Sequence, residues 1–304
     1  MANKLHITVV GSAALDTIET QSDHADNALG GSALYLAAAA SLFAPVHIVA
    51  VVGDDFDMDQ IEFLKERGCD LSGLEVAPGK TFRWHGRYHA DMNIRDTVTV
   101  ELGVFEGFSP KLPRAAAHAE ILMLANIHPD LQEGVLEQMK GKRFVAFDTM
   151  NHWISGTRSG VESILKKVDL VLLNDEELAL LVGGNSIFEG AAKLMKMGPK
   201  YVVVKKGEHG SVFFSQKGVP FLCPAFPLAN PKDPTGAGDS FAGGMLGYLA
   251  ATGDFDPMNM RRAVVYGGVV ASFTVEEFSM RRLETLTEEE VHERYRQFIE
   301  MTEF

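Results

Sequence analysis

The sequence predicts an α/β protein whose mostly parallel central sheet is covered by helices on both faces. Its short runs of Val, Ile, Leu and Phe are nearly continuously apolar, as strands buried on both faces of a parallel sheet are. Segments of helical length separate these runs, so strand and helix alternate along the chain. With 304 residues, 46% of them hydrophobic, the chain can bury a sizeable core. No change in composition marks a boundary, so we expect a single domain over 1–304.

The expected elements follow one another in chain order. The apolar run 33–52 is long enough for a membrane span, but Pro45 and His47 divide it, which favours a helix followed by a strand. The expected strands are LHITVVG (5–11), VHIVAVVG (46–53), ILMLANI (121–127), FVAFDTM (144–150), VDLVLLN (168–174) and YVVVKKG (201–207). The expected helices span 31–43, 57–67, 131–140, 175–181, 187–197 and 240–251.

The segment 80–105 departs from this rhythm. It alternates aromatic or apolar residues with polar ones, which is typical of a hairpin with one exposed face. The segment 15–20 is suited to pair with it, so we expect a small β-sheet built from 13–26 and 80–105. Such a sheet projecting from an α/β core is a natural lid, because lids exclude water during group transfer. The structural alternative is a hairpin that only packs on the core or on a second subunit.

Charge and cysteine content narrow the partners. The net charge of −13 disfavours nucleic acid and anionic membranes, which attract basic surfaces, and favours a small molecule. Any anionic ligand must then be held by local groups such as backbone amides. Cys69 and Cys223 are too few and too far apart for a disulfide scaffold, so we expect buried thiols. No basic and apolar leader opens the sequence, and a cytoplasmic location is expected.

The stretch DPTGAGDSF (233–241) predicts a sharp turn before a buried helix. Pro234 fixes its own φ, while Gly236 and Gly238 permit conformations closed to other residues. The amides of Gly236, Ala237 and Gly238 would then lie unpaired at the positive end of the helix dipole, which suits a phosphate. Asp239 has two interpretations here. It either stabilises the helix end or accepts a proton from a hydroxyl that attacks phosphorus.

These residues lead to a resemblance. The stretch DPTGAGDSFAGGMLGYLA is similar to the C-terminal motif of the ribokinase-like, or phosphofructokinase B (PfkB), family of carbohydrate and nucleoside kinases. GSAALD (11–16), GGSALYLA (30–37), NDEE (174–177) and KKGEHG (205–210) follow the order of that family. The resemblance covers essentially the whole chain. It implies a three-layer α/β sandwich with a small β-sheet lid, ATP as phosphate donor, Mg²⁺, and a homodimer through the lid as one option.

The resemblance also assigns roles on the phosphate side. It implies that Asp239 is the catalytic base and that Gly236, Ala237 and Gly238 form an anion hole. Asn174 and Glu177 match an N-x-x-E motif that acts on Mg²⁺ and phosphate largely through water. Their spacing suits one helical face, and Mg²⁺ prefers oxygen ligands, although the residues alone indicate an acidic helix start.

KKGEHG matches a T-x-G-x-x-G loop beside the nucleotide, with Lys205 where Thr is usual and with Gly207 and Gly210 as its glycines. Gly238 and Thr235 are also expected near the nucleotide. Asp233 and Thr235 match residues that border a monovalent-cation site, such as one for K⁺, in some members. The alternative for this last pair is that they only make turn hydrogen bonds.

On the acceptor side, Asp16 matches an aspartate that binds substrate hydroxyls. Gly30 and Gly31 match paired glycines that let the sugar approach the backbone. Tyr35 stands where the family often has Asn at the substrate, and Asn126 falls near a position that contacts substrate.

Three other patterns resemble functional motifs, but each lacks a feature that its motif requires. GDDFDMDQIEFLKE (53–66) spaces its carboxylates like an EF-hand but lacks the glycine at the sixth position. His85 and His89 lie four apart in an expected strand, where they do not converge on a metal. GSAALD lacks the G-x-G-x-x-G fingerprint of dinucleotide-binding oxidoreductases.

The sequence therefore predicts an ATP- and Mg²⁺-dependent kinase that phosphorylates a hydroxyl of a small sugar, as ribokinases and fructokinases do. A nucleoside kinase is the alternative within the same class, because aromatic and basic residues of the lid could stack on a base, although they could equally be ordinary strand residues. They are Phe82, Trp84, Arg87 and Tyr88. Arg83, Arg87 and Arg95 leave open an acceptor that already carries a phosphate. A nucleotide- or sugar-binding regulator without turnover is the alternative from another class.

Overall fold

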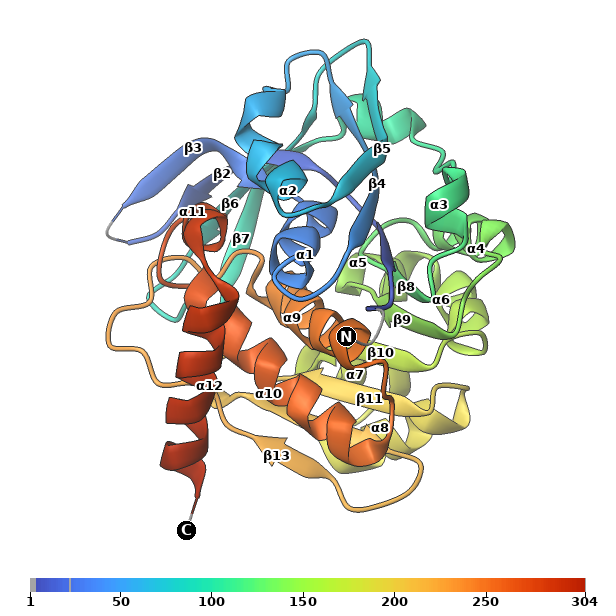
Figure 1. Ribbon diagram of the computed structural model, residues 1–304, viewed down its shortest axis with the longest axis vertical. Coiled ribbons are helices and arrows are strands. Elements are labelled where there is room, and N and C mark those ends of the chain that lie inside the picture. The colour runs from blue at the N-terminus through green and yellow to red at the C-terminus, as the bar shows by residue number, and fades with distance from the viewer. Residues whose placement is uncertain (1–3, 22, 304) are drawn as a thin grey trace.

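The computed structural model describes residues 4–21 and 23–303. Residues 1–3 and 304 of the expected single domain, and Ser22 of the segment 13–26, lie outside the described residues. These described residues form two sheets, a large one of nine strands and a small one of four (Figure 1). The large sheet has the order β13-β12-β11-β10-β9-β8-β1-β4-β5. Its strands are β1 (Ile7–Val10), β4 (Val46–Gly53), β5 (Asp70–Ala77), β8 (Ile121–Leu124), β9 (Phe144–Asp148), β10 (Leu170–Asn174), β11 (Tyr201–Lys205), β12 (Ser211–Ser215) and β13 (Phe221–Cys223).

The predicted α/β class with a mostly parallel sheet is confirmed. All six expected strands occur, and each pairs in parallel with its neighbours within the run from β4 to β11. Every residue of β1, β4, β8 and β9 is buried, which explains their continuous apolar sequences. The sheet also extends beyond the expected strands. β5 pairs in parallel with β4 at one edge, and the antiparallel strands β12 and β13 follow β11 at the other.

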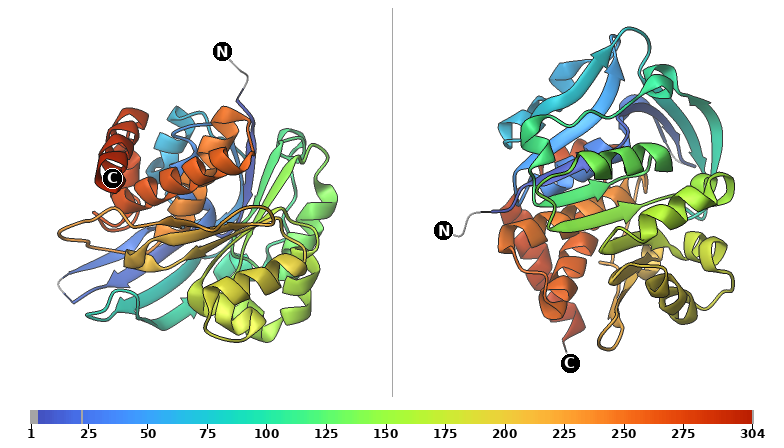
Figure 2. Two further views of the ribbon diagram at one scale, coloured as in Figure 1. Left: turned by 90° about the horizontal axis from the view of Figure 1, so that it is seen from below. Right: turned by 90° about the vertical axis from the view of Figure 1, so that its right-hand side faces the viewer.

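Helices cover both faces of the large sheet (Figure 2). Successive residues of one strand therefore enter different cores, with Val9 on one side and Val10 on the other. Cys69 and Cys223 are buried and free, as predicted. The first face carries α1 (Ser32–Ala40), α2 (Glu62–Glu66), α9 (Ala237–Thr252), α10 (Pro257–Thr274), α11 (Arg281–Thr285) and α12 (Glu288–Thr302). The second carries α3 (Arg114–Ala117), α4 (Pro129–Gln138), α5 (Asn151–Gly156), α6 (Arg158–Leu165), α7 (Asp175–Val182) and α8 (Ile187–Lys196). Among the described residues there are also three short 3-10 helices: η1 (Met58–Ile61), η2 (Gly103–Gly107) and η3 (Gly207–His209).

The expected small sheet is confirmed, and we call it the lid sheet. It has the order β3-β2-β6-β7, with β2 (Ala14–Glu19), β3 (His24–Gly30), β6 (Phe82–Tyr88) and β7 (Arg95–Glu101). Asp55, just beyond β4, fixes it to the core. Its carboxylate accepts bonds of 2.8 Å from both the amide and the hydroxyl of Thr81, and one of 2.9 Å from Arg83. The edge strand β7 is exposed along its whole length. A homodimer through the lid stays a prediction.

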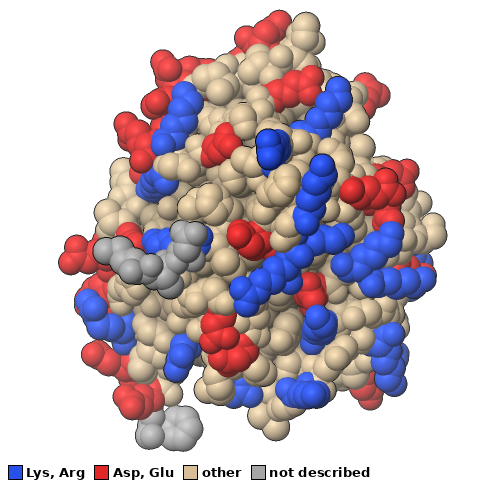
Figure 3. Space-filling model, turned by 45° about the vertical axis from the view of Figure 1, so that its right-hand side comes forward, with Lys and Arg blue, Asp and Glu red and all other residues tan. Residues whose placement is uncertain are grey.

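Within the part of the chain that the structure describes, no helix is both long and apolar enough to cross a membrane. On the face drawn in Figure 3, basic and acidic side chains are both spread over the surface. The favourable field for an anionic ligand must therefore come from the local arrangement of groups at a site, which is the expectation set by the net charge of −13.

Helix α9 lies between α1 and α10, and its glycines make this close packing possible. An added Cβ at Gly243 would meet the carbonyl oxygen of Leu36 in α1 at 2.4 Å, and one at Gly247 would meet Phe43 at 2.8 Å. On the α10 side, a Cβ at Gly244 would lie 2.9 Å from Val270. The glycine-rich sequence after Asp239 thus fixes the depth at which α9 sits in the core, and with it the position of its N-terminus.

We predict that Gly243→Ala lowers the free energy of unfolding by roughly 1–3 kcal/mol, because overpacking must push α9 away from α1. Gly268→Ala in α10 is the matched control, since an added Cβ there meets nothing within 4 Å. That control should be neutral or stabilise by up to about 1 kcal/mol through helix propensity. Chemical denaturation of both variants measures the difference, and equal effects at the two glycines would contradict the packing account.

Candidate active site

The predicted site residues gather at the carboxyl ends of the parallel strands, around the N-terminus of α9. Consecutive strands end in Asp148 (β9), Asn174 (β10) and Lys205 (β11), and Asn174 is paired in register with Lys205. Strand order reverses between β1, which leads to β4 and β5, and β8, which leads toward β11. Ligands of open α/β sheets bind at the carboxyl ends near such a reversal. The topology therefore puts the candidate site at this end of the large sheet.

The turn before α9 is fixed by the fully buried carboxylate of Asp233. One of its oxygens accepts from the amide of Thr235 at 2.8 Å and the other from the amide of Ser279 at 2.9 Å. The hydroxyl of Thr235 lies 3.0 Å from that of Tyr88 in the lid sheet. Both residues that were expected to border a monovalent cation are thus engaged in holding the turn and joining it to the lid. A cation beside them stays a prediction.

Gly236 caps α9 in the left-handed conformation, with φ of 73°. An added Cβ there would lie 2.4 Å from the ring of Tyr35, so glycine is required both by the backbone and by this contact. Tyr35 itself is 1% exposed, and its hydroxyl has no partner among the described residues. Tyr35, which was expected at the acceptor, therefore lies beneath the turn and supports it from below.

Two of the three expected amides are free, and the third is not. The amide of Ala237 donates to the carbonyl of Pro234 at 3.2 Å, so the expectation of a free amide is corrected there. For Gly236, Gly238 and also Asp239, no protein acceptor bonds the backbone N–H within the described ranges. These three groups lie at the positive end of a 16-residue helix and can bind an anion.

Asp239 stands in the first turn of α9 with a perturbed carboxyl group. Withdrawal from solvent is the largest cause that raises its pKa to about 7, and the charge of Asp148 adds to it. Lys205 and Arg95 oppose the increase. A carboxylate whose pKa lies near neutrality is suited to accept and release a proton at physiological pH, which a simple helix-capping aspartate is not.

Asn174 and Glu177 form a reciprocal capping box at the start of α7. The amide of Glu177 donates to Oδ1 of Asn174 at 2.7 Å, and the amide of Asn174 donates to Oε2 of Glu177 at 2.8 Å. Burial and the charge of Asp148 raise the pKa of Glu177 to about 7. The cap uses only Oε2 of Glu177, so Oε1 is left to act on a hydrated metal ion. The capping role and the predicted metal role are therefore compatible.

Asp16 presents an unpaired acceptor to the same region. Its Oδ1 is buried and has no hydrogen-bond partner among the described residues. Burial, followed by the charges of Asp233 and Asp239, raises its pKa to about 8. An added Cβ at Gly30 would lie 1.9 Å from Oδ2 of Asp16. Gly30 therefore makes room for Asp16, where the resemblance implied room for a sugar.

The other predicted residues have local partners that explain them. An added Cβ at Gly31, with φ of 94°, would meet the carbonyl of Ser12 at 2.5 Å, so this glycine lets β3 pass the end of β1. Asn126, after β8, accepts a bond of 2.9 Å from the indole N–H of Trp153. Its role toward a substrate stays a prediction.

The loop after β11 meets the tip of the lid. At Gly207, with φ of 53°, an added Cβ would lie 2.1 Å from Oδ1 of Asn93, which belongs to the turn between β6 and β7. At Gly210 it would meet the carbonyl of Cys223 at 2.1 Å. Glycine at 210 is thus required by the backbone at the end of β13, whereas the exposed side chain of Asn93 could move away from a Cβ at 207. The lid tip thus lies beside the loop that was expected to bind nucleotide.

Sequence reasoning missed Asp148, which joins the site through Lys205. The Lys205 ammonium donates to Oδ2 of Asp148 at 2.9 Å. A usable signal was present, since Asp148 follows a run of four apolar residues in the expected strand 144–150, as Asn174 does in the next one. Sequence reasoning also gave Asn93 no role. No pattern indicates its contact with Gly207, which depends on how the lid is oriented.

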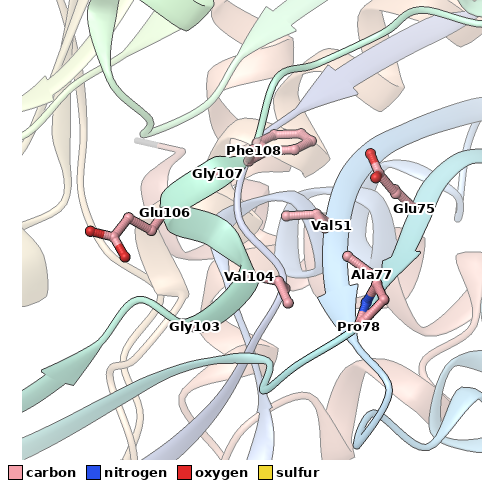
Figure 4. Close-up of a pocket in the computed structure, with 9 residues that line it drawn as sticks. All are labelled: Val51, Glu75, Ala77, Pro78, Gly103, Val104, Glu106, Gly107 and Phe108. Atoms are coloured by element: carbon pink, nitrogen blue, oxygen red, sulfur yellow. The ribbon is translucent and has the colours of Figure 1, made fainter.

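A separate cavity of about 420 Å³ lies between β4, β5 and η2, at the edge of the large sheet away from β11 (Figure 4). Its lining contains no lysine or arginine. Its two carboxylates, Glu75 and Glu106, stand on opposite sides of the hollow. None of the predicted site residues lines it. This cavity is therefore separate from the site predicted around α9.

The chain is similar to known kinases along most of its length. A family model described as pfkB family carbohydrate kinase matches residues 4–286. The chain belongs to this family. PfkB-family kinases are phosphotransferases that act on hydroxyl groups. A cytidine kinase of Thermococcus kodakarensis is 31% identical over 251 residues, which cover 80% of this chain and 88% of that protein.

Solved PfkB-family structures share the fold. A nucleoside kinase of Methanocaldococcus jannaschii superposes with a TM-score of 0.76 at 21% identity, covering 97% of this chain and all of that one. An Escherichia coli protein described as a candidate ribokinase II, in complex with ATP and Mg²⁺, gives a TM-score of 0.80 at 19% identity, covering 96% of this chain and 99% of that one. These similarities confirm the three-layer architecture with a second, smaller sheet.

The crowding of buried carboxyl groups predicts how stability depends on pH. The folded-state pKa of Asp16 is about 8, well above the ordinary value near 4, so its contribution to stability is present in acid and is lost as pH rises toward 8. Asp16→Asn removes this ionisation. We expect it to stabilise the ligand-free protein by roughly 1–4 kcal/mol more at pH 8 than at pH 5.

Thermal and denaturant unfolding at the two pH values measure this difference. Asp26→Asn on β3 is the matched control, because its side chain is 60% exposed. A change in stability for Asp16→Asn that is the same at both pH values would show that Asp16 is already ionised in the free protein, contrary to this prediction.

Proposed function

We propose that this protein is an ATP- and Mg²⁺-dependent kinase that transfers the γ-phosphoryl group to a hydroxyl of a small ribose-containing acceptor. The single observation that carries the proposal is the combination at the start of α9. Unpaired amides of Gly236 and Gly238 lie beside Asp239, whose pKa is about 7. An anion site and a base with a near-neutral pKa in one helical turn are what phosphoryl transfer to a hydroxyl requires.

In the proposed step, the acceptor oxygen forms a bond to the γ-phosphorus while its proton passes to the carboxylate of Asp239. The bond between the γ-phosphorus and the bridging oxygen breaks, and ADP leaves with that electron pair. The amides of Gly236 and Gly238 donate to the oxygens on which charge accumulates. Oδ1 of Asp16 accepts from a hydroxyl of the acceptor, which supplies the partner that this buried atom lacks in the protein.

The residues present suit a metal that keeps most of its own water. Within the described residues, no group of three or more His, Cys, Asp and Glu side chains is arranged to hold a metal ion. Mg²⁺ typically retains waters and binds through phosphates and one or two carboxylates. In the proposal, Glu177 and Asn174 orient this hydrated ion. When bound, the ion neutralises phosphate charge. The proposal places ATP beside four residues: Lys205, Gly207, Gly210 and Thr235. It also includes a K⁺ ion near Asp233.

A nucleoside is the acceptor that we favour, with a free sugar as the second candidate. The similarity to a cytidine kinase supports this choice, although the sequence motifs alone favour a sugar. Trp84 adds a structural reason. It is paired in register with Asp16 on parallel strands, so the two side chains share one face of the lid sheet. A base attached to a ribose held by Asp16 would find a flat aromatic surface beside it.

We predict that Asp239→Asn folds normally and loses turnover by about 10²–10⁴-fold, because the amide cannot accept the proton. Asp254→Asn is the control near the other end of α9, since asparagine can still accept the bond that Asp254 receives from the amide of Asp256. In the wild type, kcat/KM should fall as pH decreases below about 7, since the base must be ionised. Near-normal turnover of Asp239→Asn would refute the assignment.

The acceptor can be identified by thermal shift with a nonhydrolysable ATP analogue, using pyrimidine and purine nucleosides, ribose, deoxyribose and fructose. We expect a nucleoside to stabilise most, because stabilisation grows with ligand concentration over Kd. Trp84→Ala should raise the nucleoside KM about tenfold, and Trp84→Phe should raise it less. A sugar that stabilises most, with no effect of Trp84→Ala, would favour the sugar kinase. Binding across the panel without any ATP consumption would favour a regulator.

A further inference from the structure

Lys205 is a largely buried cation at the end of β11. Its side chain is 18% exposed and reaches from the end of β11 across β10 to Asp148 at the end of β9. The carboxylate of Asp148, 8% exposed, accepts its bond at 2.9 Å. Nothing in the strands requires this pair, because β9 and β11 are already joined through β10 by backbone hydrogen bonds.

The ammonium group ends at the first turn of α9. An added Cβ at Gly238 would lie 3.1 Å from Nζ of Lys205. A positive charge at a helix N-terminus is opposed by the helix dipole, and burial opposes it further. Burial alone would lower the pKa of Lys205, but the charges of Asp148, Glu177 and Asp239 together raise it above the ordinary value. The lysine therefore stays charged at the point where an unliganded helix end repels it.

An anion bound between the ammonium group and the N-terminus of α9 would make the position of this buried charge favourable. It would attract both the helix N-terminus and the ammonium group, which otherwise repel each other. We propose that Lys205 is a catalytic residue, whose ammonium group binds the γ-phosphoryl oxygens beside Gly238 during transfer, and that Asp148 is the positioning residue that aims it. This inference rests on the proposed kinase function. Lys205 keeps its proton throughout, and the bonds that form and break are those described above.

Lys205→Ala tests the inference, with Lys200→Ala as the matched control. Lys200 precedes the same strand and makes a similar pair, 2.8 Å from Asp169, at the opposite end of the sheet. We expect Lys205→Ala to lower kcat by about 10²–10³-fold, as loss of one donor to a transferring charge does, while the KM of the acceptor changes little. Methylammonium should restore part of this loss. Lys200→Ala should keep wild-type kcat.

Asp148→Asn tests the positioning role. It should lower kcat by about tenfold, and the double variant Lys205→Ala/Asp148→Asn should lose no more than Lys205→Ala alone. Such non-additivity is expected when one residue acts only through the other. A purely structural Asp148 would instead lower activity and thermal stability further in the double variant. If Lys205→Ala does not fold, Lys205→Met replaces it in these assays, because methionine keeps the aliphatic part of the side chain.

The outcomes separate this inference from the proposed function. If the wild type transfers phosphate and Lys205→Ala keeps kcat within about threefold of it, or is not rescued by methylammonium, the inference is overturned and the kinase assignment stands. If the wild type transfers no phosphate to any acceptor, the proposed function itself fails. Calorimetric binding of a nonhydrolysable ATP analogue gives the second readout. Lys205→Ala should weaken it far less than it lowers kcat.

Discussion

The buried carboxylate of Asp233 is the constraint on which the candidate site depends. It accepts hydrogen bonds from the amides of Thr235 and Ser279, and these bonds hold the turn that precedes α9. The turn brings Gly236 over the ring of Tyr35 and starts α9 without a side-chain cap. Because the cap is missing, the amides of Gly238 and Asp239 stay free for a ligand. The position of Asp239 follows from the same turn.

The site concentrates negative charge where a negative ligand is expected, and this conflict explains its chemistry. Asp16, Glu177 and Asp239 all have raised pKa values, mainly through burial. Each of these carboxyl groups is therefore less readily ionised than an ordinary one, and this limits mutual repulsion. The attraction for phosphate is then left to amides, Mg²⁺ and lysine. A chain with a net charge of −13 can in this way bind an anion without a basic surface.

The sequence predicted the fold class, all six of its expected strands and the helix after Gly238, because these depend on apolar periodicity and on local turn chemistry. The family motif placed Asp239 and its neighbours correctly on that helix. What sequence could not supply depends on contacts between distant segments. Gly30 is explained by Asp16, and Gly210 by the backbone at the end of β13. The capture of the Ala237 amide by Pro234 is a detail of turn geometry that no residue pattern reveals.

The measurement that tests the account most directly is ³¹P NMR of the products formed from ATP, Mg²⁺ and the acceptor that stabilises the protein most. If the turn before α9 directs the γ-phosphoryl group to an organic hydroxyl, the spectrum should show ADP and a phosphomonoester in equal amounts. Inorganic phosphate as the only product beside ADP would show that water is the acceptor, and an unchanged ATP spectrum would show no transfer. Either result would contradict the account.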